Sequence, residues 1–310
     1  MVNVMRKAVL SMVLMCGALA ASIGSASAAQ LNAVASFSVL ADVVKQVGGD
    51  RVKVSSLVPA NGDPHEFEPT PRDAGRLNNA DLVFLSGLGL EGWLDRLVSA
   101  SGYKSHAITV SEGIKPLDAA EEDDDHQHRH GGSDPHVWND VANVKLWVDN
   151  IEQALEKKDP AGAEVYKANA TRYRHQLDQL DSDIRSEIQS VPQAQRKVLT
   201  SHDALGYYGH AYGVSFLSPQ GLSTSSEASA RDVAALISQI KREHISAYFF
   251  ENANDPRLVK QIAAATGAKP SGELYVESLS TEQGPAADYL SMMRYNTEQM
   301  VAAMKGSHDH

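Results

Sequence analysis

The 310-residue chain contains a single cysteine, Cys16, and this scarcity limits both its stability and its chemistry. Cys16 lies in an N-terminal segment that we expect to be removed, so the mature chain has neither a thiol nor a disulfide. Thiolate metal sites and cysteine nucleophiles are therefore excluded. The fold must be held by its core alone, which suits a large chain rather than a small cross-linked one.

The N-terminal apolar run is too short for a membrane-spanning helix, which needs about 20 residues. It extends from Ala8 to Ile23, is interrupted by Ser11, and is preceded by Arg6-Lys7. The small residues Ala26-Ser27-Ala28 follow it. A positive region, an apolar core and an Ala-x-Ala site together predict a secretory signal peptide over residues 1–28.

A retained membrane anchor is the alternative interpretation of this segment. Cys16 suggests a lipoprotein, but Met15 before it is too large for the usual small-residue lipoprotein signal. We therefore expect a soluble, secreted mature protein that begins at Ala29 or Gln30.

Basic residues are outnumbered by acidic ones, and the formal charge of the chain is −11. Removal of Arg6 and Lys7, with no acidic residue among the first 28, makes the mature chain −13. An acidic surface argues against nucleic acid or an anionic membrane as partner and is compatible with attracting cations.

The first half of the mature chain alternates between predicted strands and helices. Such alternation predicts a mostly parallel sheet with helices on both faces, here an N-terminal β/α lobe over residues 29–158. The predicted strands are Leu31–Ser36, Val52–Val58, Ala80–Leu85 and Lys104–Val110, and the predicted helices are Val39–Val47 and Gly92–Ala100.

A long helix is predicted over residues 159–191. Asp159-Pro160 reads as an N-cap followed by proline at the first helical position. Val191-Pro192 ends the helix, because proline restricts the residue before it. One face carries apolar residues at spacings of three and four, namely Tyr173, Leu177, Leu180, Ile184 and Ile188. A helix of this length can join two lobes.

The second β/α series predicts a C-terminal lobe over residues 192–310. Thr224 and Glu227 have the spacing of a capping box for a helix that carries Val233, Leu236, Ile237 and Ile240. The other predicted helices are Ala204–Tyr212, Pro256–Thr266 and Pro285–Met304, and the predicted strands are Lys197–Ser201, Val214–Leu217, Ala247–Glu251 and Glu273–Val276. The fold class is thus α/β, with two lobes joined by one long helix.

Four potential metal ligands are distributed equally between the two halves. His65 lies in the loop after strand Val52–Val58, and His136 follows Asp134-Pro135. His202 directly follows one predicted strand, and Glu277 directly follows another. Ligands of open α/β sheets bind beyond the carboxyl ends of strands, so two facing lobes would form one cleft between them. Sequence spacing alone does not establish that the four side chains converge.

Three imidazoles and a carboxylate form a nitrogen and oxygen set that suits tetrahedral zinc. A zinc-dependent hydrolase or lyase is the alternative from another class, because three histidines and a water also form a catalytic zinc set. The sequence contains no His-Glu-x-x-His motif and no recognisable general base. Residues Ser201-His202-Asp203 are consecutive and cannot form a triad. We therefore expect no catalytic residue.

A second histidine group lies in the charged segment 121–132, which has no apolar residue and is expected to be a surface loop. His126, His128 and His130 alternate there with other polar residues and could bind metal weakly. An acidic, solvated loop without bound metal is the alternative.

Three motifs resemble the signature segments of the ZnuA-like group, the metal-specific substrate-binding proteins of ABC importers. They are Asn61-Gly62-Asp63-Pro64-His65-Glu66-Phe67-Glu68-Pro69, Asp134-Pro135-His136-Val137-Trp138 and Ser201-His202-Asp203-Ala204-Leu205-Gly206-Tyr207. The resemblance extends from about Leu31 to Met304. It implies two β/α lobes with the metal between them, His65, His136 and His202 as ligands, and a frequent His-rich loop at the position of 121–132.

The resemblance also implies which metal the protein binds and which partners it has. Manganese-binding relatives usually have glutamate at the third ligand position, so His202 favours Zn²⁺ over Mn²⁺. Glu277 stands where the family usually has aspartate, and either Glu277 or a water would be the fourth ligand. The resemblance implies a periplasmic monomer that delivers metal to a membrane permease, with a periplasmic metallochaperone as a further candidate partner. Surface adhesion or metal buffering without transport remains open.

Overall fold

The computed structural model describes residues 30–117, 133–225, 228–245, 247–268 and 270–306. The predicted signal peptide at 1–28 and the predicted loop at 121–132 lie outside these residues. Leu31–His310 cluster as one unit, and only that unit is described below.

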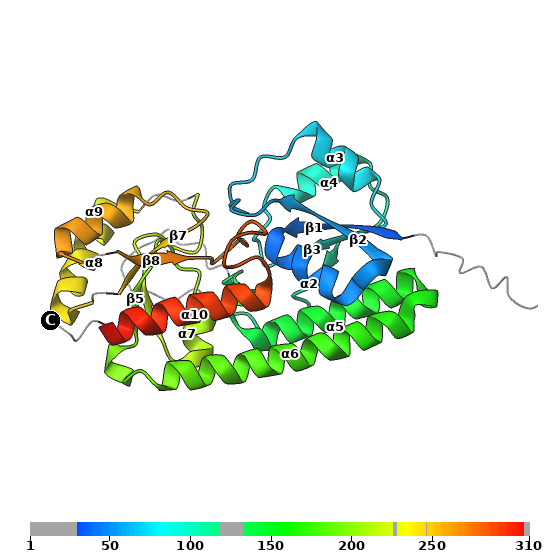
Figure 1. Ribbon diagram of the computed structural model, residues 1–310. Helices are drawn as coiled ribbons and strands as arrows, with labels where there is room; N and C mark the ends of the chain where they lie inside the picture. The colour runs from blue at the N-terminus through cyan, green and yellow to red at the C-terminus, as the bar shows by residue number, and fades with distance from the viewer. Residues whose placement is uncertain (1–29, 118–132, 226–227, 246, 269, 307–310) are drawn as a thin grey trace, which may run out of the picture. The chain divides into compact units, whose positions relative to one another are not determined.

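The N-terminal half forms a parallel sheet of β1 (Leu31–Phe37), β2 (Val52–Val58), β3 (Leu82–Leu85) and β4 (Ile108–Thr109). Their order in the sheet is β2-β1-β3-β4. The helices of this half are α2 (Ser38–Gly48), α3 (Pro71–Asn78) and α4 (Leu94–Ser101). Figure 1 shows α3 and α4 above this sheet and α2 below it.

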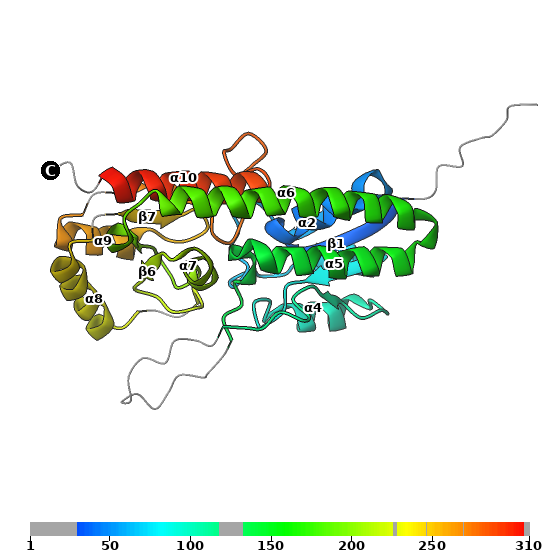
Figure 2. The ribbon, with the colours of Figure 1, turned by 90° about the horizontal axis from the view of Figure 1, so that it is seen from below.

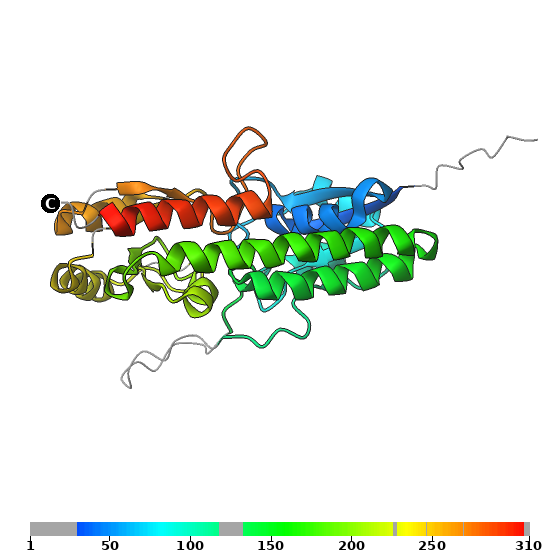
Figure 3. The same ribbon diagram turned by 60° about the horizontal axis from the view of Figure 1, so that its bottom comes forward.

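Two long helices follow, α5 (Val141–Lys158) and α6 (Ala163–Gln189), with a 3-10 turn at Pro160–Gly162 between them. They lie side by side (Figure 3) and below the N-terminal sheet in the view of Figure 1. The 27 residues of α6 make a helix of about 40 Å at 1.5 Å per residue. It runs past both sheets in Figure 2, so the predicted long helix is present.

The start of α6 differs from the prediction. Asp159 does not cap it, because Gly162 is the N-cap residue. The Asp159 carboxylate instead accepts hydrogen bonds from the Arg51 guanidinium at 2.7 and 2.9 Å and from the Tyr166 hydroxyl at 2.7 Å. This group ties the N-terminal half to the first turn of α6. The proposed division of the chain at residues 158 and 191 stays a prediction.

The C-terminal half contains a second parallel sheet, formed by β5 (Lys197–Leu199), β6 (Ser215–Leu217), β7 (Tyr248–Glu251) and β8 (Pro270–Leu274). These strands are parallel in the order β6-β5-β7-β8. The helices are α7 (Gly206–Tyr212), α8 (Ala230–Glu243), α9 (Arg257–Thr266) and α10 (Tyr289–Gly306). Figure 3 shows α10 alongside α6. The predicted two-lobed α/β fold is therefore confirmed.

Two local predictions in this half are wrong. The N-cap of α8 is Ser229, whose hydroxyl accepts a hydrogen bond from the backbone N–H of Asp232. Thr224 therefore does not cap this helix. Strand β8 ends at Leu274, so Glu277 lies in the loop beyond it rather than directly at its end.

The apolar core is continuous between the lobes. One cluster of buried side chains extends from the N-terminal sheet through α5 and α6 to α10 and part of the second sheet. A smaller cluster lies between the second sheet and helices α8 and α9. The predicted apolar face of α6 is buried throughout, at Tyr173, Leu177, Leu180, Ile184 and Ile188. Separation of the lobes would therefore expose core surface.

Leu180→Ala should destabilise the metal-free protein by about 2–5 kcal/mol, because it leaves a cavity in this shared core. Leu180 is fully buried, whereas Lys167 on the same helix is exposed. The matched control Lys167→Ala should change the free energy of unfolding by no more than about 0.5 kcal/mol. Urea unfolding monitored by circular dichroism measures both. Equal effects of the two substitutions would contradict this packing.

Candidate metal centre

The four candidate side chains named from the sequence come together in the structure. One ligand atom from each of His65, His136, His202 and Glu277 lies within 4.8 Å of every other. His65 comes from the loop after β2, His136 from the segment before α5, and the other two from loops that follow β5 and β8. Parallel strands deliver their following loops to one edge of a sheet, which places His65 at that edge of the first sheet and His202 and Glu277 at that edge of the second.

One carboxylate oxygen lies at the centre of the group. Glu277 Oε1 is 2.7 Å from Nε2 of His65, 3.1 Å from Nε2 of His136 and 3.3 Å from Nε2 of His202. The Nε2 atoms of His65 and His136 are 3.1 Å apart. Three imidazole nitrogens therefore face the same small volume as the carboxylate.

His136 is oriented by the residue two positions before it. Asp134 Oδ1 accepts hydrogen bonds from the His136 backbone N–H at 2.9 Å and from ring atom Nδ1 at 2.8 Å. A proton held on Nδ1 leaves the lone pair of Nε2 free to face the centre, the usual arrangement of a metal-binding histidine. Asp134 was not singled out from the sequence as an orienting residue, although its spacing to His136 was visible.

His202 is oriented in the same way by a distant carboxylate. Glu251, the last residue of β7, accepts from His202 Nδ1 at 2.5 Å and from the backbone N–H groups of Ser201 and His202 at 2.7 and 3.0 Å. Asn254 also donates to Glu251, at 2.6 Å. Glu251 is an acid at a strand end, and nothing in its local sequence selects it for this role. Asp140, an acid four residues after His136, caps α5 instead.

Burial leaves part of this group without ordinary hydrogen-bond partners. The side chains of His136 and His202 are fully buried and that of Glu277 is 1% exposed. Among the described residues, His202 Nε2 and Glu277 Oε2 are buried atoms without a hydrogen-bond partner. An unpaired buried polar atom is costly, so these two atoms favour a cation that both can bind.

The pKa values follow from the same packing. Burial alone would lower the pKa of His136 and His202, but the carboxylates of Asp134, Glu251 and Glu277 outweigh it and raise both. Burial alone would likewise raise the pKa of Glu277, yet the surrounding histidines hold it well below its usual range. Without metal, the group therefore favours imidazolium ions around a carboxylate.

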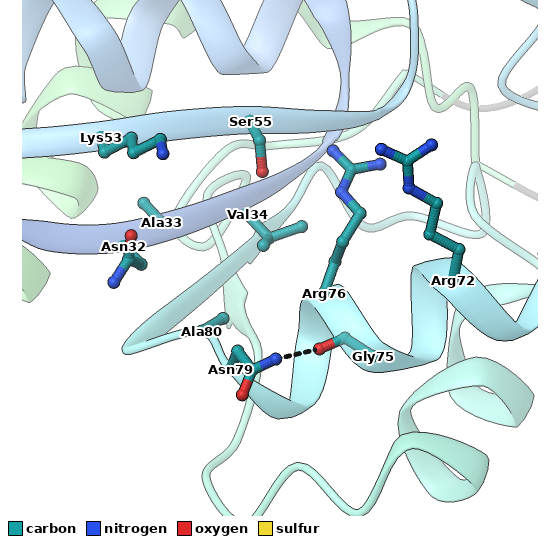
Figure 4. A pocket seen from close by; sticks show the side chains of 10 residues that line it. All are labelled: Asn32, Ala33, Val34, Lys53, Ser55, Arg72, Gly75, Arg76, Asn79 and Ala80. Atoms are coloured by element: carbon teal, nitrogen blue, oxygen red, sulfur yellow. Dashed lines mark hydrogen bonds between the residues drawn. The ribbon is translucent and has the colours of Figure 1, made fainter.

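A separate hollow of about 440 Å³ lies on the N-terminal lobe, between β1, β2 and α3 (Figure 4). Its cationic side chains are Lys53, Arg72 and Arg76, and its lining contains no histidine and no carboxylate. It therefore lacks the imidazole and carboxylate groups that the four-residue group brings together. His126, His128 and His130 lie outside the described residues.

The chain is similar to known metal-binding proteins. The chain is 33% identical over 274 residues to the manganese-binding lipoprotein MntA of Halalkalibacterium halodurans, with 88% of each sequence covered. Its fold is similar to the periplasmic zinc binding protein TroA from Treponema pallidum, with a TM-score of 0.82, 30% identity, and coverage of 89% of this chain and 99% of that one.

A second solved structure is similar at the same sequence identity. The Mn-bound S38A mutant of a periplasmic metal binding protein from candidatus Liberibacter asiaticus gives a TM-score of 0.79 at 30% identity, covering 89% of this chain and all of that one. The fold and the relatives define a metal-binding substrate-binding protein of an ABC importer.

Residues 33–303 match the model of the ZnuA family, described as zinc-uptake complex component A periplasmic, and the chain belongs to this family. Its members are transport components rather than enzymes, so the hydrolase alternative is excluded. Such a component implies a membrane permease and an ATPase as partners. Among the residues that the structure describes, no helix is both long and apolar enough to cross a membrane.

Metal affinity should fall on acidification, and the fall should begin above pH 6.5. A protonated imidazole cannot bind metal, and the pKa values of His136 and His202 are raised above their ordinary value of 6.5. Protons therefore compete with metal at a pH where a free histidine is already neutral. Competition titrations with a chromophoric chelator, from about pH 5.5 to about pH 8.5, measure this. A constant affinity across that range would contradict a three-histidine site.

Proposed function

We propose that this protein captures Zn²⁺ and delivers it to the ABC importer. The supporting observation is the convergence of three imidazole Nε2 atoms with one carboxylate oxygen in a buried site. A nitrogen-rich set of four ligands suits zinc, whereas Mn²⁺ prefers more carboxylate, carbonyl and water oxygens. We assign His65, His136, His202 and Glu277 as the ligands.

The spacing of the ligand atoms is compatible with such an ion. Four ligands about 2.0 Å from a tetrahedral ion lie about 3.3 Å from one another. The four short separations around Glu277 Oε1 and between His65 and His136 are 2.7, 3.1, 3.1 and 3.3 Å. A bound ion would therefore lengthen the shortest separation by about 0.6 Å and shorten those that exceed 3.3 Å, which reach at most 4.8 Å. The position of Glu277 Oε1, within 3.3 Å of all three imidazole nitrogens, supports Glu277, rather than a water, as the fourth ligand.

Manganese is the second candidate, because several relatives are named as manganese-binding proteins. Nitrogen sites generally bind Zn²⁺ more tightly than Mn²⁺, so a simple affinity ratio does not decide which ion is the cargo. A change of that ratio on substitution of one imidazole by a carboxylate is more informative. It reports how much of the selectivity comes from His202.

Titration with Zn²⁺ and Mn²⁺ should find one tight site that His136→Ala abolishes. The affinity should fall by at least about a hundredfold, since even loss of an outer partner of a ligand costs 10–100-fold. His202→Glu should weaken Zn²⁺ binding by about tenfold or more and raise the affinity for Mn²⁺ relative to Zn²⁺.

His175→Ala, at an exposed position of α6, is the matched histidine control and should bind as the wild type does. Retention of tight binding by His136→Ala would overturn the ligand assignment. An unchanged Zn²⁺ to Mn²⁺ ratio in His202→Glu would contradict the assignment of His202 as a ligand. Deletion of residues 121–132 should leave the tight site intact, because His126, His128 and His130 are proposed to bind metal only weakly.

We further propose that the mature protein is a periplasmic monomer, released by cleavage after residue 28, and that a periplasmic metallochaperone can load it. Several relatives are named lipoproteins, so the alternative is that a lipid anchor at the N-terminus holds the mature protein at the membrane. N-terminal sequencing of the secreted protein should start at Ala29 or Gln30. A mature N-terminus at a lipid-modified Cys16 would contradict this proposal.

A further inference from the structure

The segment 218–225, called the strap here, connects β6 to the region before α8 and begins beside one of the metal-binding loops. The backbone N–H of Thr200 donates to Leu217 O at 2.9 Å, and that of Asp203 donates to Gly221 O at 3.2 Å. Between these bonds, His202 forms an isolated parallel bridge with Gln220. The first half of the strap is therefore attached along the backbone that carries His202.

The other end of the strap reaches the opposite lobe. The Thr224 hydroxyl donates to Asp63 Oδ2 at 2.7 Å. The second oxygen of the same carboxylate, Oδ1, accepts from the backbone N–H of His65 at 2.7 Å and from that of Glu66 at 3.4 Å. One carboxylate thus joins the strap to the backbone of His65. The strap connects the His202 loop of the C-terminal lobe to the His65 loop of the N-terminal lobe.

The loop that carries His65 has a second contact with the C-terminal lobe. Asn61 N–H donates to Leu279 O at 3.0 Å, and the Asn252 amide donates to Asn61 Oδ1 at 3.0 Å. These contacts hold the beginning of the loop, four residues before His65. The hydrogen bond between Thr224 and Asp63 lies closer to His65 in the loop.

His65 is the ligand best placed to leave first. Its side chain is 6% exposed, whereas His136, His202 and Glu277 are between 0 and 1% exposed. Carboxylates hold the rings of His136 and His202 through Nδ1. Outside the ligand group, where its Nε2 lies 2.7 Å from Glu277 Oε1, the contacts described for His65 act on the backbone of its loop. Asp63 accepts from the His65 N–H, and the Trp93 indole N–H donates to Pro64 O at 2.7 Å. Movement of this loop would open the site with little disturbance of the other ligands.

We propose that Thr224 and Asp63 are positioning residues that hold His65 over bound metal and thereby set the rate of metal release. This inference rests on the proposed metal site and adds a kinetic control to it. Separation of the strap from Asp63 frees the His65 loop on the side of the C-terminal lobe. The metal can then leave while the shared core between the lobes stays packed.

The test compares two substitutions of Thr224 that differ in one group. Thr224→Val keeps the shape and removes the hydroxyl, whereas Thr224→Ser keeps the donor. Metal release into excess chelator, followed by stopped flow on Zn²⁺-loaded protein, should be about tenfold faster for Thr224→Val, the scale of one hydrogen bond to a charged acceptor. Thr224→Ser should release metal at the wild-type rate.

Ser223→Ala is the matched control, because the Ser223 hydroxyl bonds Ser225 within the strap at 2.7 Å rather than the other lobe. It should also release metal at the wild-type rate. A wild-type rate for Thr224→Val would overturn the proposal. Equal acceleration by Ser223→Ala would also overturn it, because general loosening of the strap would then be the cause.

Hydrogen exchange in metal-free protein separates this inference from the proposed function. Thr224→Val should accelerate exchange of the His65 and Glu66 amides, both of which donate to Asp63, and Thr224→Ser should not. If the wild type bound no metal, the proposed function would fail, and this measurement would still decide whether the strap positions the loop. Unchanged exchange in Thr224→Val would refute the positioning role directly.

Discussion

The burial of the four candidate metal ligands where the loops of two sheets meet is the constraint on which the rest of the structure depends. Buried charge is costly unless it is paired, and here one carboxylate serves three imidazoles. The neighbouring carboxylates raise the pKa values of His136 and His202, and the surrounding histidines lower the pKa of Glu277, so the buried charges favour pairing with one another. A divalent cation bound as proposed would take the place of protons on the imidazoles. The same packed site can therefore exist in both states, which is what a protein that captures and releases its cargo requires.

The scaffold meets this constraint with two parallel sheets and a core that joins them. Parallel strands deliver the loops after β2, β5 and β8 to the site, and α6 and α10 pack against both halves. Bonds from the C-terminal lobe to the N-terminal lobe also cluster near α10. The Tyr289 N–H donates to Asp42, and the Tyr289 hydroxyl donates to the Trp138 carbonyl. Separation of the lobes near α10 would break packed contacts and buried hydrogen bonds together. Movement of the His65 loop would break fewer contacts, so we expect metal to exchange through that loop.

The sequence predicted the strands and the ligand group better than the helix ends and the orienting contacts. The periodicity of strand Val52–Val58 and the positions of the four candidate ligands depend on local sequence pattern, which is visible without the structure. Helix α5 was not assigned, although Val144, Trp147, Ile151 and Leu155 have helical spacing. The cap at Asp159 failed because Arg51, 108 residues away, binds its carboxylate. Local propensity limits the structural roles that a residue can take, and its contacts in the folded protein decide which role it takes.

The same limit explains why neither Glu251 nor Asp63 could be selected from the sequence. Both are acids near strand ends or ligand loops, and only the fold decides that Glu251 orients a ring while Asp63 holds a backbone. That difference has a physical consequence. A carboxylate on Nδ1 stabilises both the orientation and the charge of His202, so the ring stays in place with either a proton or a metal on Nε2. A carboxylate on the backbone of His65 fixes the loop, whereas the contacts of the His65 ring are with other members of the ligand group. His136 and His202 would stay in place while His65 moves with its loop. The site would then bind metal tightly and still release it on the side of the His65 loop.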